Sequence, residues 1–293
     1  MLISLIAAPG GLTPDTAETV CSAFGGGPLR WLSPREAAEF AVPARPDTLA
    51  HVRAEMSLMG IDVNALPEEG RRKRLLLADM DSTMIEQECI DELADVAGVG
   101  ERVAEITARA MNGEIGFEGA LEARLKLLEG LPTRAIERVL RERITLAPGG
   151  AALVATMKAQ GARAVLVSGG FTAFTEWVAG ALGFDDHRAN VLEAEGGVLL
   201  GTARRPYLGR EAKVEALSFE AAAMGIDAGD VLAVGDGAND LGMIGQAGMG
   251  VALHAKPAVR DAAPLAVDHG DLTALLFLQG YERSEFTEAP DPA

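Results

Sequence analysis

The sequence predicts an α/β fold in which a parallel, Rossmann-like sheet carries an inserted helical cap and follows a small N-terminal α+β unit. Three observations predict it. Short apolar runs at 75–79, 164–170 and 231–237 end in glycine- or aspartate-rich turns and are separated by helical segments, as in an open α/β sheet. The stretch 85–146 has a helical pattern almost throughout and is too long for a simple crossover connection. Residues 1–70 mix shorter strand and helix patterns.

Length, charge and cysteine content limit the classes of protein to consider. A chain of 293 residues suggests about two domains. Its 26 Lys and Arg against 43 Asp and Glu leave a net charge of −17, which excludes a general nucleic-acid binder but leaves a basic protein partner open. Cys21 and Cys89 form neither a disulfide framework nor a zinc site, and both are expected to be buried thiols. No stretch is expected to span a membrane or act as a signal peptide, so a cytoplasmic location is expected.

Residues 1–70 are expected to form the small α+β unit. Strand patterns occur at 2–7, 29–32 and 39–42, and helix patterns run from Thr13 to the glycines at 25–27 and from 46 to 59. The basic run 71–74 follows them. A solvated edge is the simpler interpretation of this run, with a binding role as the alternative.

The elements after residue 74 follow in order. The three apolar runs do not alternate, which indicates strands covered on both faces. Helices are expected at 149–160, 172–182, 211–224 and 239–247, and in the insertion at 89–96, 101–111, 117–128 and 133–143; Gly196-Gly197 indicates a hairpin. The predicted organisation is an α+β unit at 1–70, a core at 71–84 and 147–285, a helical cap at 85–146 over the strand ends, and a flexible tail at 286–293.

Polar side chains follow the predicted strands, where an open α/β sheet has its ligand crevice. They are Asp79 and Asp81 after the first run, Ser168, Gly169 and Gly170 after the second, Lys213 farther along, and Asp236, Asn239 and Asp240 after the third. Each alone is most often a turn or cap residue. Together they bring carboxylates, a hydroxyl and an ammonium to one crevice, which suits phosphoryl transfer.

These residue types also predict a cofactor. Clustered Asp79, Asp236 and Asp240 would repel one another, and a divalent cation relieves the repulsion. A small number of hard oxygen ligands selects Mg²⁺, which keeps several waters and takes a substrate phosphate oxygen. Lys213, the Ser168 hydroxyl and the N–H groups of the glycine turn, including Gly169, would hold the other phosphate oxygens.

The motifs carry a resemblance to a known family. DMDST, VSGG, a lysine and GDGAND, in this order, are similar to the motifs of the haloacid dehalogenase (HAD) superfamily of aspartyl-phosphate phosphatases. The segments MIEQECIDELADVAG, MNGEIGFEGALEARLKLLEGLP, LVSGGFT and VGDGANDLGMI resemble the phosphoserine phosphatases of the bacterial SerB type over about residues 72–280. This resemblance implies a HAD-like core with a cap and Mg²⁺-dependent hydrolysis of O-phospho-L-serine, the last step of L-serine biosynthesis.

The resemblance also implies a role for each matching residue. Asp79 is the expected nucleophile that forms an aspartyl-phosphate, and Asp81 is the expected general acid and then general base. The metal is expected on the Asp79 carboxylate, the Asp81 backbone carbonyl and Asp236, with Asp240 orienting its surroundings. Asn239 is expected to contact the substrate.

Substrate selection is expected from the cap side. By resemblance, Glu88 faces the serine ammonium and Arg124 binds the serine carboxylate, because arginine offers a planar fork to a carboxylate. Phe117 is expected in the apolar cover that excludes water, or simply in the packing of the cap. The four histidines share no motif spacing with each other or with a serine or cysteine and are expected to be structural or surface residues. Cys89 is expected to be buried in the first cap helix, because the site is arranged for a carboxylate nucleophile.

Three alternatives remain at this stage. A receiver-like signalling module also combines an acceptor aspartate, Mg²⁺, a hydroxyl and a lysine, but its order of motifs differs from the order here. A related phosphatase or phosphotransferase could act on another small phosphorylated amino acid, because the length of the substrate side chain is not readable from Glu88 and Arg124. Residues 1–70 could be a serine sensor resembling ACT domains, a surface for a homodimer or a structural extension, and the last two are preferred.

Overall fold

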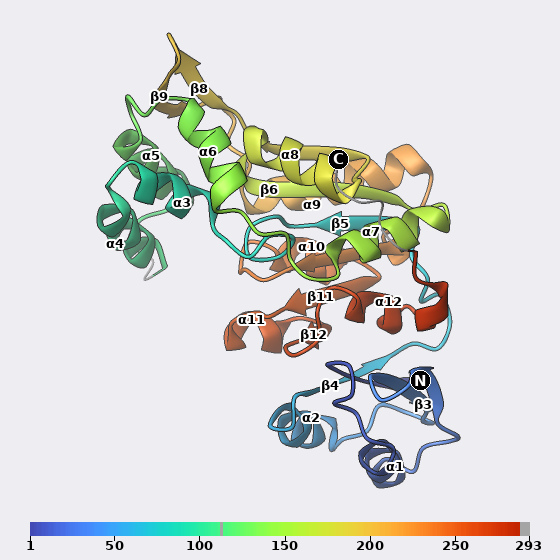
Figure 1. The fold of residues 1–293 in the computed structure, drawn as a ribbon. Coiled ribbons are helices and arrows are strands. Elements are labelled where there is room, and N and C mark those ends of the chain that lie inside the picture. The colour runs from blue at the N-terminus through green and yellow to red at the C-terminus, as the bar shows by residue number, and fades with distance from the viewer. Residues whose placement is uncertain (112–113, 288–293) are drawn as a thin grey trace.

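The computed structural model describes residues 1–111 and 114–287. Its central sheet has six parallel strands in the order β12-β11-β10-β5-β6-β7 (Figure 1). The strands are β5 (Leu75–Ala78), β6 (Arg163–Phe171), β7 (Asp186–Asn190), β10 (Val231–Gly235), β11 (Met249–Leu253) and β12 (Leu265–Val267). The three expected strands are therefore confirmed as neighbours at the centre of the sheet, whereas β7, β11 and β12 went unassigned in the sequence.

Helices cover both faces of this sheet, as the continuous apolar strands predict. Leu75 and Leu77 of β5 pack in one cluster with residues of α9 (Arg210–Met224) and α10 (Leu241–Gln246). Leu76 and Ala78 of the same strand pack on the opposite face, in a cluster with residues of α7 (Gly150–Ala159), α8 (Thr172–Leu182) and α12 (Ala274–Leu278). The remaining core elements are α11 (Pro257–Ala262) and the 3-10 turns Ala228–Asp230 and Arg283–Glu285.

The expected helical insertion is present between β5 and β6. It consists of α3 (Cys89–Val96), α4 (Gly100–Met111), α5 (Phe117–Leu127) and α6 (Arg134–Glu142). Ile85 and Leu146 form an antiparallel bridge where the chain leaves and re-enters the core. The hairpin of β8 (Leu192–Glu195) and β9 (Val198–Ala203) lies beside the cap (Figure 1), and the Leu199 N–H donates to Leu131 O at 2.9 Å.

The N-terminal unit has an antiparallel sheet in the order β2-β3-β1-β4. Its elements are β1 (Leu2–Ala7), α1 (Pro14–Ala23), β2 (Arg30–Ser33), β3 (Ala37–Ala41), α2 (Leu49–Ser57) and β4 (Ile61–Leu66). Thr13 begins α1 by accepting a hydrogen bond from Thr16 N at 3.1 Å, and Pro14 follows at the first helical position. Strand β4 went unrecognised in the sequence because Asp62 and Asn64, polar residues in its middle, are both buried.

These two polar residues join β4 to the core. Asn64 donates to Ala266 O at 2.8 Å and accepts from Ala266 N at 3.1 Å, so its amide pairs with β12 as a neighbouring strand would. The Asp62 carboxylate accepts from the N–H groups of Asp268, His269 and Gly270 at 2.8–3.1 Å. The N-terminal unit therefore covers the edge of the parallel sheet (Figure 1).

The basic run is only partly a solvated edge. Arg72 and Arg74 are exposed, but Lys73 is buried and donates from Nζ to Gly70 O and Gly229 O at 2.6 and 2.7 Å. Arg71 lies 2.7 Å from the buried Glu39 carboxylate of β3. The expectation of a fully solvated run is wrong for these two residues because their charges join the N-terminal unit to the core.

The expected tail begins with residues that contact the core. Phe286 stacks against Phe277 with ring centroids 5.1 Å apart, and Thr287 N donates to Thr156 Oγ1 at 2.9 Å. Residues 112–113 of the cap and 288–293 of the tail lie outside the described residues. Over the part of the chain that the structure describes, no helix is long and apolar enough to cross a membrane.

Candidate active site

The chain turns sharply after β5 and gives Asp79 and Asp81 different surroundings. Asp79 continues the strand, because its N–H donates to Val234 O of β10 at 3.0 Å. The N–H groups of Thr83, Met84 and Ile85 then converge on Met80 O at 2.9–3.2 Å and close the turn. Asp79 consequently points to one side of the strand end and Asp81 is free to make other contacts.

Lys213 lies beneath the strand ends between two carboxylates. Its ammonium, 1% exposed, is 2.5 Å from Asp79 Oδ1 and 2.6 Å from Asp240 Oδ1. Burial alone would lower the pKa of Lys213, but the charges of Asp79 and Asp240 outweigh burial and raise it. The second oxygen of Asp240 accepts from Gly237 N at 3.0 Å, so both of its oxygens have partners. Lys213 is therefore a fixed positive charge next to Asp79.

The acidic cluster carries more negative charge than Lys213 balances. Carboxylate oxygens of Asp79, Asp236 and Asp240 all lie within 4.8 Å of one another. Burial and the charge of Asp240 raise the pKa of Asp79, and the same causes raise the pKa of Asp236 to about 6. One ammonium facing three carboxylates leaves room for a divalent cation, and hard oxygen donors suit Mg²⁺. The structure thus brings together the predicted metal residues Asp79 and Asp236, while the Asp81 carbonyl stays a prediction as a ligand.

The Asp81 side chain is held apart from this cluster. Its Oδ1 accepts from Cys89 N at 2.9 Å, and its Oδ2 accepts from Ser168 Oγ at 3.2 Å. Burial raises the pKa of Asp81, although the hydrogen bonds from Cys89 and Ser168 act in the opposite direction. Burial also raises the pKa of the Cys89 thiol, which favours its structural interpretation. A carboxyl group with a raised pKa beside a nucleophile is suited to general acid catalysis.

Ser168, Gly169 and Gly170 form a bulge near the end of β6. The pairing of β6 with β7 shifts from Val167↔Arg188 to Phe171↔Asn190, so two extra residues of β6 leave the ladder. Within the bulge, Gly170 N donates to Ser168 Oγ at 2.8 Å. A Cβ atom at Gly170 would lie 2.8 Å from Asp81 Oδ2, so this position needs glycine.

Core and cap enclose a pocket of about 530 Å³ above these residues. Its predicted lining residues are Asp79, Asp81, Glu88, Phe117, Arg124, Ser168, Gly169, Asp236 and Asn239. Lys213 and Asp240 lie behind this wall, where the Lys213 ammonium contacts the carboxylates of both Asp79 and Asp240. The structure therefore brings together every residue that the sequence nominated for the site.

Glu88 and Arg124 face the pocket from the cap side. Glu88 stands in the open pocket and accepts from Ser82 Oγ at 2.8 Å, yet the surrounding protein and the charge of Asp81 raise its pKa to about 7. Burial lowers the pKa of Arg124, against the charges of Asp91 and Glu88. The Glu88 carboxylate can receive an ammonium group, and the Arg124 guanidinium can receive a carboxylate group.

Three further polar lining residues, Asp91, Thr107 and Lys256, were not nominated in the sequence. Thr107 lies on α4, and among the described residues its buried hydroxyl has no hydrogen-bond partner. Nothing in a helical pattern distinguishes such a threonine from its neighbours. Lys256 follows β11 as the other site residues follow their strands, so recognising 249–253 as a strand would have nominated it.

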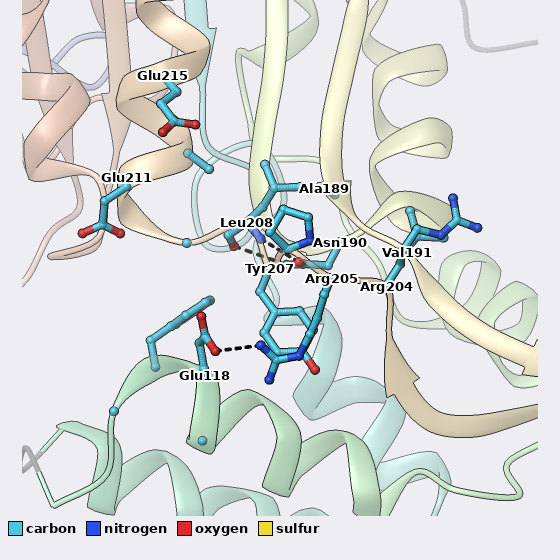
Figure 2. Close-up of a pocket in the computed structure, with 16 residues that line it drawn as sticks. Glu118, Ala189, Asn190, Val191, Arg204, Arg205, Tyr207, Leu208, Glu211 and Glu215 are labelled. Atoms are coloured by element: carbon cyan, nitrogen blue, oxygen red, sulfur yellow. Dashed lines mark hydrogen bonds and ion pairs between the residues drawn. The ribbon is translucent and has the colours of Figure 1, made fainter.

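Phe117 separates this pocket from a second cavity of about 830 Å³. Its ring packs on Gly209, where a Cβ atom would lie 3.1 Å from the ring. Figure 2 shows the second cavity between the start of α5 and the segments 189–191 and 204–215, with Glu118 bonded to Arg205 and Asn190 bonded to Leu208. Phe117 thus lines both cavities and is 44% exposed, and its place in an apolar cover stays a prediction.

The family is decided by the sequence of residues 76–244, which match the haloacid dehalogenase-like hydrolases. The chain belongs to this family. Among curated relatives of this hydrolase, the phosphoserine phosphatase of Archaeoglobus fulgidus is 42% identical over 226 residues, which are 76% of this chain and 65% of the relative. The phosphoserine phosphatase of Polaromonas sp. is 44% identical over 210 residues, 70% of this chain and 89% of that protein. This chain thus spans less than two thirds of the Archaeoglobus protein.

Solved structures share the whole architecture, including the N-terminal unit. A haloacid dehalogenase family hydrolase from Salmonella enterica superposes with a TM-score of 0.86 at 28% identity, over 94% of this chain and 97% of that chain. A probable phosphoserine phosphatase from Vibrio cholerae gives a TM-score of 0.80 at 32% identity, over 97% of this chain and 87% of that chain. The predicted fold class is therefore confirmed.

Proposed function

We propose that this hydrolase is a Mg²⁺-dependent phosphoserine phosphatase, which converts O-phospho-L-serine and water to L-serine and phosphate. The observation that carries the proposal is the separation of two aspartates at one pocket. Asp79 is ion-paired with Lys213, whereas Asp81 accepts its hydrogen bonds from Cys89 N and Ser168 Oγ. Phosphoryl transfer through an aspartyl-phosphate needs these two roles, an ionised nucleophile and a proton donor.

The residues of the pocket divide the reaction into two steps. The Asp79 carboxylate attacks phosphorus, the bond to the serine oxygen breaks, and Asp81 protonates that oxygen. Asp81 then takes a proton from the water that attacks the aspartyl-phosphate, which releases phosphate and restores Asp79. Lys213, Ser168 and the N–H groups of the bulge stabilise charge on the phosphoryl oxygens throughout. Mg²⁺, held by Asp79 and Asp236 with the Asp81 carbonyl, would supply further charge neutralisation.

Selection of phosphoserine is assigned to Glu88 and Arg124. Both line the same pocket as Asp79, so a substrate with its phosphate at Asp79 would reach them with its amino and carboxylate groups. A site built from such polar groups rejects analogues that lack them, because its own charges would stay unpaired. Relatives that carry the name phosphoserine phosphatase support this assignment.

We further propose that residues 71–84 and 147–285 form the catalytic core, residues 85–146 the cap and residues 1–70 a unit that covers the sheet edge. The bridge between Ile85 and Leu146 supports the cap boundaries. The reaction would be the last step of serine synthesis and would take place in the cytoplasm. Two free cysteines, both buried, agree with a reducing compartment.

The test is phosphate release from a panel of phosphomonoesters with and without Mg²⁺. O-phospho-L-serine should be turned over far better than p-nitrophenyl phosphate or O-phospho-L-homoserine, and only with the cation. Equal rates on phosphoserine and p-nitrophenyl phosphate would refute the substrate assignment but leave the reaction class standing. An unchanged rate after removal of all divalent cations would refute the metal.

A further inference from the structure

Asn190 is a buried amide that joins two segments next to the active site. It is the last residue of β7, is 1% exposed and lies on the wall of the second cavity. Its Nδ2 donates to Gly169 O at 2.8 Å and to Leu208 O at 3.3 Å, and its Oδ1 accepts from Leu208 N at 2.8 Å. Figure 2 shows the hydrogen bonds between this amide and Leu208. Each polar atom of the side chain therefore has a partner.

The bulge at Ser168–Gly170 explains why an amide is needed here. The two extra residues of β6 cannot pair with the backbone of β7, so the Gly169 carbonyl would be left without a partner in a partly buried place. The Asn190 side chain reaches across the break and takes the place of the missing backbone N–H. The bulge can thus leave the ladder while the Gly169 carbonyl keeps a hydrogen-bond donor.

The second segment held by Asn190 leads directly to Lys213. Leu208 and Gly209 precede the first turn of α9, and Lys213 is the fourth residue of that helix. One side chain thus joins the bulge that carries Ser168 to the start of the helix that carries the buried lysine. Both segments supply groups that stabilise the phosphoryl oxygens in the proposed reaction.

We propose that Asn190 is a positioning residue for phosphate: its amide fixes the Gly169 backbone and the start of α9 relative to each other. The proposal rests on the proposed function, since it concerns the phosphate subsite of that reaction. It assigns a role to a residue that does not line the catalytic pocket. The alternative is an amide that only stabilises the fold.

Asn64 offers a matched control within the same chain. It is also fully buried, and its amide also bonds both backbone groups of one residue, Ala266. It lies at the boundary of the N-terminal unit, away from the pocket. Asn64→Ala and Asn190→Ala therefore remove comparable hydrogen bonds, and only the second should affect phosphate binding.

The experiment compares Asn190→Ala, Asn190→Asp and Asn64→Ala in the full chain with Mg²⁺. We expect both Asn190 variants to lose about 10- to 100-fold in kcat and to raise the inhibition constant of inorganic phosphate about tenfold, as small misplacements of reacting groups do. Asn64→Ala should lower the melting temperature without changing the inhibition constant. An inhibition constant does not depend on the folded fraction, so a purely structural role would leave it unchanged.

Asn190→Asp keeps the shape and the acceptor for Leu208 N but loses the donor to Gly169 O, so it also covers the case in which Asn190→Ala fails to fold. Phosphate inhibition within about twofold of wild type in the Asp variant would overturn the proposal, because a lost positioning group changes binding of the transferred group. Hydrogen exchange of segment 165–171 gives a readout that needs no activity. Faster exchange in Asn190→Asp than in Asn64→Ala supports the proposal even for a wild type without phosphatase activity, and equal exchange contradicts it.

Discussion

Replacing Lys213 with methionine removes the ammonium between Asp79 and Asp240 while it keeps a long, unbranched side chain. The structure buries all three groups, with exposures of 1% for Lys213, 5% for Asp79 and 0% for Asp240. Removing one partner of a buried ion pair costs about 3–5 kcal/mol, because the other charge stays buried without compensation. For the core and cap together, residues 71–285, that loss corresponds to a fall in melting temperature of roughly 6–20 °C.

The assay is a thermal melt in EDTA and again in Mg²⁺. Without the cation, the Lys213→Met protein should melt well below wild type. With Mg²⁺ the variant should regain more stability than wild type gains, since the cation then faces a cluster with one more uncompensated negative charge. Turnover in Mg²⁺ should be lost, because in the proposed reaction Lys213 stabilises the Asp79 carboxylate and the phosphoryl oxygens.

Lys158→Met is the control for this experiment. Lys158 lies 2.7 Å from Asp185 Oδ1, but its side chain is 36% exposed. An exposed pair contributes only about 0–1 kcal/mol, so this variant should melt close to wild type. A melting temperature of Lys213→Met within about 2 °C of wild type in EDTA would be a much smaller shift than a broken buried pair predicts. That result would refute the charged arrangement of Asp79 and Asp240.

Other predictions concern the remaining site residues. Asp79→Asn should abolish turnover and the hydroxylamine-labile phosphoenzyme, and activity within about tenfold of wild type would contradict a nucleophile, whose loss costs far more. Arg124→Ala should impair phosphoserine turnover and spare small aryl phosphates, whereas equal losses would assign Arg124 to structure. Because the pKa of Glu88 is raised to about 7, its carboxylate is neutral below that pH and cannot receive an ammonium. The kcat/KM for phosphoserine should therefore rise with pH through about 7, and a Glu88→Gln variant that kept the same rise would refute this cause.

The sequence predicts the catalytic region well because the information there is local. Asp79 and Asp81 lie directly after an apolar run, and the helical cap begins and ends where helical patterns begin and end. Parallel strands bring their carboxyl ends to one edge, so residues at these positions meet without any knowledge of the loops. The hydrogen bonds and ion pairs between these residues come from the structure.

Residues whose partners are far away in the sequence could not be predicted in this way. Asn64 donates a hydrogen bond to Ala266, 202 positions later, and Asn190 donates one to the carbonyl of Gly169 across a break in the β6–β7 ladder. A pattern of apolar and polar residues assigns an asparagine to the solvent side, whereas both of these amides are buried because they replace backbone pairing. Strand β4 was missed for this reason, and Asn190 was never nominated.

The buried groups of β4 also bear on the purpose of residues 1–70. The match with a relative from Polaromonas takes in 89% of that protein but only 70% of this chain. Here the Asp62 carboxylate accepts hydrogen bonds from three N–H groups of the core, and the Asn64 amide pairs with β12. Residues 1–70 therefore cover the sheet edge rather than reach the pocket.

Asp62→Ala in the full chain separates a covering role from a sensing role. The substitution leaves the N–H groups of residues 268–270 without their acceptor, and the buried one at Gly270 alone costs about 1–3 kcal/mol, so the melting temperature should fall clearly. Turnover at 25 °C and inhibition by L-serine should stay at wild-type values, because none of these groups lines the catalytic pocket. Serine inhibition that weakens in Asp62→Ala, at a temperature where the protein is fully folded, would contradict the covering role and favour a sensor. The edge-covering role is the one for which the structure supplies contacts, because the buried Asp62 carboxylate accepts hydrogen bonds from three backbone N–H groups of the core.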